Sequence, residues 1–325
     1  MMTRMIASCF MCLLALTTIA AEPAPKKKAK APTGPPPTMA DVAYGTDPRQ
    51  ILDFWKADTS APAPLLFYIH GGGWQGGEKR TVYGQGLTNL LGLGISVVSI
   101  EYRFVSQAHA AGIRPPVAWP LQDAARALQF VRSKAKEWNI DKSRIAASGG
   151  SAGACSSLWL AFHDDMADPK SADPVAREST RLTCAAVLGA QTTLDPLQMK
   201  EWTPNSRYGS HAFGIFKTVN GKDVADFEKF LAERARILPW IKQYSPYELV
   251  SADDPPIFLH YNAPPAMGQE QKDPTHTANF GVKLEERLRS VGVECVLAYP
   301  GSPAVDSEVA KFAAVSKDRM QQFLA

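Results

Sequence analysis

The feature of this sequence that most constrains its fold is the alternation of short apolar runs with amphipathic segments of helical period. Segments such as LQDAARALQFVRSKAKEW and FGVKLEERLRSVG carry apolar residues three and four positions apart, which is typical of helices. Between such segments lie short runs that end in turn residues, as buried strands do: PLLFYIHGG, ISVVSIEYR, RIAASGG, CAAVLGAQ, PPIFLHYN and CVLAYPG. The pattern predicts an α/β fold with a mostly parallel central sheet and helices on both faces. Two earlier runs, VAYG and QILDFWKA, predict that the domain starts with short antiparallel strands.

The 325 residues divide by composition into three parts. Residues 1–21 have one early arginine, an apolar run and small residues at the exit, which predicts an export signal cleaved after Ala21. An uncleaved membrane anchor is the alternative, although the run is short for a span. Residues 22–39, rich in proline and lysine, predict a flexible tether. Residues 40–325 then form one folded domain, secreted or periplasmic, with no stable membrane span after cleavage.

Charge and cysteine usage exclude several classes of function. Without its first 39 residues the chain has nearly equal numbers of acidic and basic residues, so nothing predicts nucleic-acid binding. Cys155, Cys184 and Cys295 are an odd number and fall within expected helix or strand, which favours buried thiols over a disulfide. No metal-ligand spacing occurs among them. We expect no metal and no cofactor.

The strongest chemical signal is the pentapeptide Gly149-Gly150-Ser151-Ala152-Gly153, which follows an expected strand directly. Its glycines would let the chain turn sharply and hold Ser151 in a strained elbow above the sheet. A serine hydroxyl is barely nucleophilic at neutral pH unless a positioned base accepts its proton. The pentapeptide therefore predicts a nucleophile and requires a base elsewhere in the chain.

A second motif, His70-Gly71-Gly72-Gly73-Trp74, ends another expected strand and exposes backbone N–H groups. With FYIHGGGW, SIEYR, WPLQDAARALQFVRSKAKEWNIDKSRIAASGGSAG and SADDPPIFLHY in this order, the chain resembles the α/β-hydrolases of the hormone-sensitive-lipase and bacterial acetylesterase (BD-FAE-like) type. The resemblance covers roughly residues 41–301. It implies that Gly72 and Gly73, with the N–H of Ala152, form an oxyanion hole beside the nucleophile Ser151.

Three residues near these motifs have simpler explanations. His70, just before the glycines, is expected to brace the loop through a hydrogen bond rather than to act in catalysis. Arg103 and Asp123 are expected to form a structural ion pair or local caps.

The second half of the chain departs from the pattern of the resembled family. There the acid follows the strand after the DPP turn, where this chain has Leu259-His260-Tyr261-Asn262-Ala263-Pro264, with proline at the aligned position. The base should follow the last strand, but Tyr299-Pro300-Gly301-Ser302-Pro303-Ala304-Val305 contains no histidine. The acid and the base are both missing from their usual places.

His276, with Asp273 three residues before it, is the most plausible substitute pair. It precedes a helix and follows the penultimate strand, hence it should lie near the carboxyl end of the sheet. The alternative is a helix cap with a solvated histidine. His211 is the second candidate base, from a segment that could move over the serine. His163 and His260 are less suitable, because one should point away from Ser151 and the other should lie within a strand.

Residues 192–250 form a long segment between two strands. It is expected either to cover the catalytic end as a partial lid or to be an ordinary helical connection. Its sequence VADFEKFLAERARIL predicts one helix.

Two functions remain open. The first is an exported serine esterase that hydrolyses short acyl esters of small molecules or polysaccharides, acetyl esters among them. The second is a non-catalytic protein that uses the hydrolase fold to bind a carbohydrate, an ester or a protein. The elbow and the glycine loop favour the enzyme, since a binding protein needs no strained serine, whereas the missing acid and base favour the binding protein.

Overall fold

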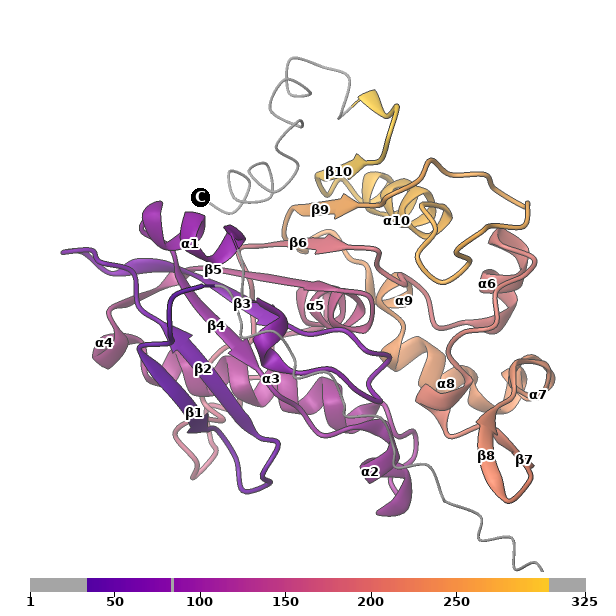
Figure 1. The fold of residues 1–325 in the computed structure, drawn as a ribbon, viewed down its shortest axis with the longest axis horizontal. Coiled ribbons are helices and arrows are strands. Elements are labelled where there is room, and N and C mark those ends of the chain that lie inside the picture. Colours follow the sequence, from indigo (N-terminus) through magenta and orange to yellow (C-terminus); the bar gives the residue numbers. More distant parts are fainter. Residues whose placement is uncertain (1–33, 83–84, 304–325) are drawn as a thin grey trace, which may run out of the picture. The chain divides into compact units, whose positions relative to one another are not determined.

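The structure is a computed structural model that describes residues 34–82 and 85–303. Its centre is an eight-stranded sheet in the order β1-β2-β4-β3-β5-β6-β9-β10 (Figure 1). The strands are β1 (Met39–Ala43), β2 (Ile51–Trp55), β3 (Ala63–Ile69), β4 (Ser96–Ile100), β5 (Ile140–Gly150), β6 (Cys184–Leu188), β9 (Ile257–His260) and β10 (Cys295–Ala298). Every strand expected from the sequence is present.

The direction of the strands agrees with the sequence pattern. β2 pairs antiparallel with both β1 and β4, which confirms the antiparallel start. The pairs from β4 across to β10 are all parallel. Because parallel strands end at the same edge, the loops after β3, β5, β6 and β9 gather at one side of the sheet.

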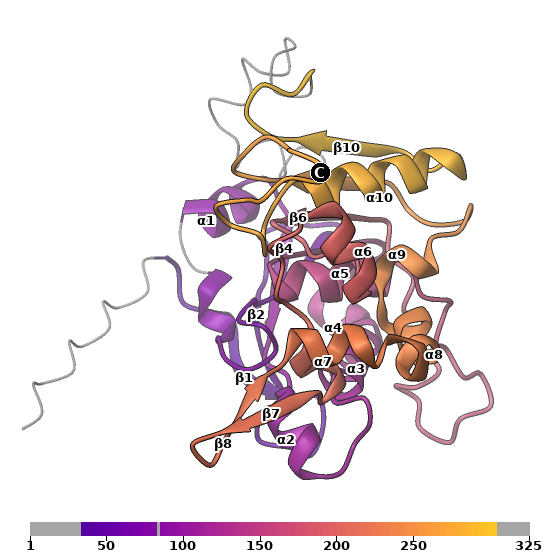
Figure 2. The ribbon, with the colours of Figure 1, turned by 90° about the vertical axis from the view of Figure 1, so that its right-hand side faces the viewer.

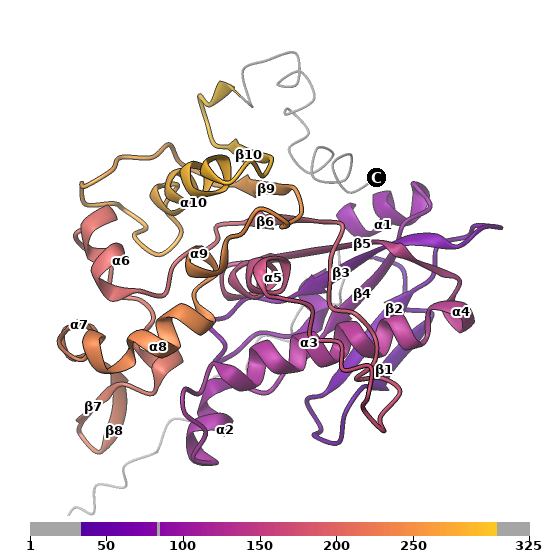
Figure 3. The same cartoon turned by 180° about the vertical axis from the view of Figure 1, so that it is seen from behind.

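Helices cover both faces of this sheet, as expected. The α-helices of the described residues are α1 (Gln85–Gly92), α2 (Val105–Ala110), α3 (Ala118–Ser133), α4 (Ala135–Trp138), α5 (Ala152–Phe162), α6 (Pro196–Trp202), α7 (Phe227–Ala232), α8 (Arg234–Tyr244), α9 (Pro246–Leu249) and α10 (Asn279–Ser290). Leu65 and Phe67 of β3 belong to one hydrophobic cluster and Leu66 between them belongs to the other, since side chains along a strand point to opposite faces. The larger cluster receives residues of α3, α5 and α10, whereas α1 packs into the smaller one. Figure 3 shows α3 and α5 running side by side over the first face.

The helix α5 is buried along its whole length. It starts at Ala152, directly after Ser151, and every one of its residues is buried, among them Cys155 and Trp159. A helix that is apolar on all sides belongs in the interior of a protein. Ser151 is therefore attached to the most deeply buried helix of the fold.

The segment between β6 and β9 is more divided than the sequence predicts. It contains α6, the 3₁₀ helix η2 (Ser210–Phe213), a hairpin of β7 (Phe216–Val219) and β8 (Lys222–Ala225), and then α7, α8 and α9 (Figure 2). The single helix expected over VADFEKFLAERARIL is wrong. Val224 and Ala225 belong to β8, and the helical part is split at Glu233 into α7 and α8. The hairpin turns at Asn220 and Gly221, both with positive φ, as two-residue hairpin turns require.

Contacts of the domain begin before residue 40. Trp55 Nε1 donates to the Pro35 carbonyl at 3.0 Å, and the Lys56 N–H donates to Thr38 Oγ1. The predicted signal peptide and most of the predicted tether lie outside the described residues. Within the described ranges, none of the helices combines the length and the apolarity that a membrane crossing needs.

Candidate active site

Ser151 sits in a strained elbow at the end of β5. Its φ and ψ angles are 54° and −123°, a combination that residues other than glycine rarely adopt. The Ser151 N–H donates to the Leu188 carbonyl at the end of β6, which fixes the turn against the neighbouring strand. Ser151 occupies the N-cap position of α5, yet its side chain caps no N–H of the helix. The Oγ atom is therefore available to another partner.

The glycines of the elbow are required by close packing of backbones. A Cβ atom at Gly153 would lie 2.0 Å from the Ile69 carbonyl oxygen, and one at Gly149 would lie 2.4 Å from the same atom. Both contacts are far below van der Waals distance. The sequence predicts that the glycines make the sharp turn, but the residue of the elbow with a positive φ is Ser151 itself. Gly149 and Gly153 instead let the end of β3 approach the elbow.

His276 and Asp273 meet Ser151 at hydrogen-bond distance. His276 Nε2 lies 3.0 Å from Ser151 Oγ, and His276 Nδ1 lies 2.9 Å from Asp273 Oδ2. Asp273 Oδ1 also accepts the backbone N–H groups of Thr275 and His276, both at 3.2 Å. The carboxylate thus holds the ring and the turn that carries it. The structure brings together the three residues that the sequence analysis selected, in the order nucleophile, imidazole, carboxylate.

The carboxylate and the imidazole lie near solvent. The Asp273 side chain is 62% exposed and the His276 side chain is 38% exposed. Partial burial pulls the pKa of Asp273 up, but the hydrogen bond and the charge of the His276 ring outweigh burial and lower that pKa. Asp273 is therefore a carboxylate at neutral pH, as an acceptor for Nδ1–H must be.

Both side chains come from one loop, residues 261–278, here called the base loop. Pro264, at the position where the resembled family has its acid, lies at the start of this loop. After β10, residues 299–303 contain no histidine. The loop after β9 thus carries both the carboxylate and the imidazole.

Buried amide side chains attach the base loop to the rest of the fold. Gln191, just after β6, donates from Nε2 to the carbonyls of Gly189 and Thr275. Asn279, at the start of α10, is fully buried and donates from Nδ2 to three acceptors while its Oδ1 accepts the N–H of Ala266. The three acceptors are Trp202 O, Thr203 Oγ1 and Ala266 O. Sequence reasoning missed both amides, because their partners are distant in sequence and no motif marks them.

Gly189 gives the imidazole its space. Its φ is +56°, and a Cβ atom there would lie 3.3 Å from the Cβ of His276. A side chain at this position would push the ring away from Ser151.

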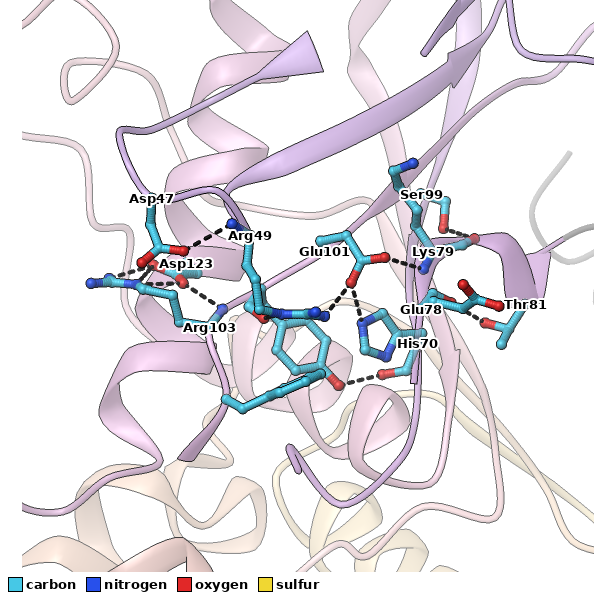
Figure 4. A network of polar contacts seen from close by, with 12 residues as sticks. Asp47, Arg49, His70, Glu78, Lys79, Thr81, Ser99, Glu101, Arg103 and Asp123 are labelled. Atoms are coloured by element: carbon cyan, nitrogen blue, oxygen red, sulfur yellow. Dashed lines mark hydrogen bonds and ion pairs between the residues drawn. The ribbon is translucent and has the colours of Figure 1, made fainter. Parts of the chain in front are cut away.

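The glycine loop after β3 rests on a buried polar network (Figure 4). His70 is fully buried, its Nδ1–H donates to the Gly71 carbonyl at 2.8 Å, and its Nε2 lies 3.3 Å from Glu101 Oε2. Glu101 in turn accepts Arg49 and the backbone N–H of Lys79. Burial raises the pKa of Glu101, but the contacts with His70, Lys79 and Arg49 outweigh it and lower that pKa. As expected from the sequence, His70 braces the loop.

The proposed oxyanion donors carry free N–H groups. Among residues 34–82 and 85–303, the N–H groups of Gly72, Gly73 and Ala152 donate to no other residue. Ala152 opens α5, so the positive end of the helix dipole also lies beside Ser151. These groups can stabilise negative charge that develops on a substrate oxygen next to Ser151.

The other histidines do not face Ser151 as bases. His211 is 5% exposed, and its Nε2 lies 3.0 Å from the Gly73 carbonyl oxygen. Because a carbonyl only accepts, Nε2 carries the proton there, so this nitrogen cannot accept one from Ser151. The structure thus places the second candidate base against the glycine loop. His163 caps α5 at the end opposite Ser151, and His260 ends β9.

The remaining expectations concern structure. Arg103 and Asp123 form a close ion pair with several hydrogen bonds, as expected. The three cysteines within the described ranges are free, with Cys155 and Cys184 buried and Cys295 half-buried. In the part of the chain that the structure describes, no group of three or more His, Cys, Asp or Glu side chains could hold a metal ion.

Known proteins are similar to this chain in sequence and in fold. The sequence model of the BD-FAE family matches residues 52–273. The esterase LipQ of Mycobacterium tuberculosis is 31% identical over 270 residues, which are 79% of this chain and 54% of LipQ. The chain therefore spans about half the length of LipQ, and it spans less of LipM, a probable carboxylic ester hydrolase of that organism.

Two solved structures have the same fold at low sequence identity. A truncated carbohydrate esterase from gut microbiota superposes with a TM-score of 0.60 at 18% identity, covering 87% of this chain and 96% of that one. An acetyl ester-xyloside bifunctional hydrolase from Caldicellulosiruptor lactoaceticus gives 0.59 at 21% identity, covering 89% and 97%. The match of the BD-FAE family model over residues 52–273 shows that this chain belongs to the BD-FAE family, and the strand order, the elbow after β5 and the solved structures show that it has the α/β-hydrolase fold.

Proposed function

We propose that this protein is a serine ester hydrolase in which Ser151 is the nucleophile, His276 the general base and Asp273 the orienting acid. The observation that carries the proposal is the pair of distances at His276: 3.0 Å from Nε2 to Ser151 Oγ and 2.9 Å from Nδ1 to Asp273 Oδ2. A nucleophile within reach of a base, with a third group orienting that base, is the arrangement that activates a serine.

The geometry supports a two-step acyl transfer. Ser151 Oγ–H donates its proton to His276 Nε2 as the oxygen attacks the ester carbonyl, and Asp273 accepts Nδ1–H and stabilises the resulting imidazolium. The N–H groups of Gly72, Gly73 and Ala152 receive the negative oxygen of the tetrahedral intermediate. The imidazolium then protonates the leaving alcohol, an acyl-serine remains, and water repeats the sequence to release the acid and restore Ser151.

We propose short acyl esters of small molecules or polysaccharides, acetyl esters among them, as the substrates. The support comes from the resembled proteins, which include a carbohydrate esterase and an acetyl ester-xyloside hydrolase by name. Export to the periplasm or the medium belongs to the same proposal, and it is supported by the composition of residues 1–21. N-terminal sequencing of the mature protein would test it, with Glu22 as the expected first residue.

A fluorophosphonate probe and a short-chain ester test the catalytic proposal together. We expect the probe to modify Ser151 covalently, and nitrophenyl acetate to be hydrolysed faster than nitrophenyl decanoate. Ser151→Ala should lose the label and lower kcat by about 10⁵- to 10⁶-fold. Ser133→Ala, on the exposed side of α3, serves as the matched control. Hydrolysis at the wild-type rate by Ser151→Ala would remove Ser151 from the mechanism, whereas a wild-type protein that takes no label and hydrolyses no ester would favour the binding function.

A further inference from the structure

His211 occupies a position that the proposed chemistry leaves unexplained. It lies in η2, within the segment between β6 and β9, more than a hundred residues from the glycine loop in sequence. Gly209 and Gly214 flank η2 with φ angles of +102° and +69°, so the chain enters and leaves this short helix through conformations that favour glycine. The His211 ring is buried, and it lies beside Trp74 and Tyr208.

The ring makes one specific contact with the glycine loop. Its Nε2 lies 3.0 Å from the Gly73 oxygen, and a Cβ atom at Gly73 would lie 3.7 Å from the same nitrogen. The ring therefore lies within ordinary van der Waals contact of the Gly73 backbone. Burial lowers the pKa of His211 to about 4, although the bond to Gly73 acts in the opposite direction. At neutral pH the ring is uncharged, and the geometry puts its proton on Nε2.

Gly73 needs such a contact more than most residues would. Gly71, Gly72 and Gly73 have no side chains to restrict their backbone, and Gly72 and Gly73 have φ angles of +105° and +61°. An oxyanion hole works only if its N–H groups already point at the place where negative charge develops. A loop of glycines therefore needs a contact from outside to hold that orientation.

We propose that His211 is a positioning residue of the oxyanion hole. Its Nε2–H donates to the Gly73 carbonyl and thereby holds the Gly73 backbone so that its N–H points toward the substrate oxygen. This proposal rests on the proposed esterase function. The proposal also assigns a role to the segment between β6 and β9, because that segment supplies the hydrogen-bond donor that holds the loop after β3.

The test compares two substitutions at one site. In His211→Gln the side-chain amide can still donate to Gly73, whereas in His211→Ala it cannot. We expect His211→Ala to lower kcat by about 10- to 100-fold with KM within about threefold, because a misplaced oxyanion donor affects the transition state more than the bound ester. His211→Gln should recover most of the loss. His163→Ala and His163→Gln are matched controls at the far end of α5.

Amide hydrogen exchange provides a readout that needs no catalysis. Exchange in residues 70–76 should speed up in His211→Ala and remain near the wild-type rate in His211→Gln. Wild-type exchange in both variants would overturn the positioning role, even if the protein hydrolyses esters. Loss of hydrolysis in both variants with unchanged exchange would overturn it in favour of direct proton transfer by His211. If the wild-type protein hydrolyses no ester, the function proposed above fails, and the exchange rates still decide whether His211 holds the loop.

Discussion

The elbow around Ser151 and the base loop contribute to the same site, but different forces hold them. The elbow, residues 149–153, is fixed by backbones in close contact, with Gly149 and Gly153 pressed against the end of β3 and α5 buried beneath it. The base loop is largely exposed and is attached through the side-chain amides of Gln191 and Asn279. The place of the nucleophile in the fold is fixed, because the packing of the core holds it. The base is held by side-chain hydrogen bonds, so a different loop of the chain can supply it, provided that its side chain reaches the serine.

Of the tests of this comparison, removal of the base should have the largest effect on kcat. We expect His276→Ala to lower kcat for a short ester by about 10⁵- to 10⁶-fold, since loss of a triad histidine alone costs nearly as much as loss of the whole triad. The free energy of unfolding should change little, because the ring is partly exposed. Steady-state kinetics and urea denaturation measure the two effects. A variant with more than a tenth of wild-type activity would show that the base lies elsewhere.

A Gly→Ala substitution in the elbow should lower the free energy of unfolding more than one in the base loop. Gly153→Ala places a Cβ atom 2.0 Å from the Ile69 oxygen, so we expect a loss of about 3 kcal/mol or more in the free energy of unfolding. Gly268→Ala, in the base loop, meets no atom within 4 Å and has a φ of +69°, so backbone strain should cost about 1 kcal/mol. Denaturation of both variants measures the difference. Equal losses would mean that the elbow is no more tightly constrained than the base loop.

Cutting the attachment of the base loop should affect both stability and rate. Asn279→Ala removes four hydrogen bonds of a fully buried side chain, and we expect a loss of about 2–3 kcal/mol in the free energy of unfolding. The rate should fall about tenfold, because a loosened loop spends less time with His276 against Ser151. Asn262→Ala, at an exposed position of the same loop, should leave stability and kcat unchanged. A fully active, destabilised Asn279→Ala would show that the position of the base does not depend on this amide.

The pH dependence of stability compares Asp273 of the base loop with His211, a buried residue outside both regions that contacts the glycine loop. The pKa of His211 is about 4 in the folded state and 6.5 as a free side chain, so the unfolded state binds its proton first as the pH falls. Stability should therefore decrease between pH 6.5 and pH 4, by about 2–3 kcal/mol from this group. His211→Gln should lack that part of the decrease. Asp273, with a lowered pKa, loses its contribution only below its ordinary range, and its exposure keeps that loss small.

The strands and the elbow could be predicted from sequence because they depend on local patterns. Apolar runs that end in turn residues identified each strand of the sheet, and GGSAG placed Ser151 between a strand and a helix. The selection of Asp273 and His276 depended on fold-level reasoning: a loop that leaves a parallel strand must begin at the carboxyl edge of the sheet. Their hydrogen bonds to each other are local, since the residues lie three apart.

Contacts between distant segments could not be predicted in this way. Nothing around Gln191 or Asn279 in the sequence indicates that they hold the base loop, because their partners are fixed only once the strands are paired. The same limit made His211 look like a candidate base when its partner is the Gly73 carbonyl. The hairpin of β7 and β8 is different: Asn220-Gly221 is a recognised turn signal, and the helical period of the following residues concealed it.

The turn from Asp273 to His276 has a consequence for how the site can switch off. Asp273 binds the ring of His276 and the backbone N–H groups of Thr275 and His276, so the acid and the imidazole form one small self-contained unit. A shift of the base loop would carry this unit with it, because its three hydrogen bonds all lie within residues 273–276. Such a shift would change the separation between His276 Nε2 and Ser151 Oγ. In the proposed mechanism, this one distance decides whether His276 can take the proton of Ser151, while the contact between Asp273 and His276 is kept.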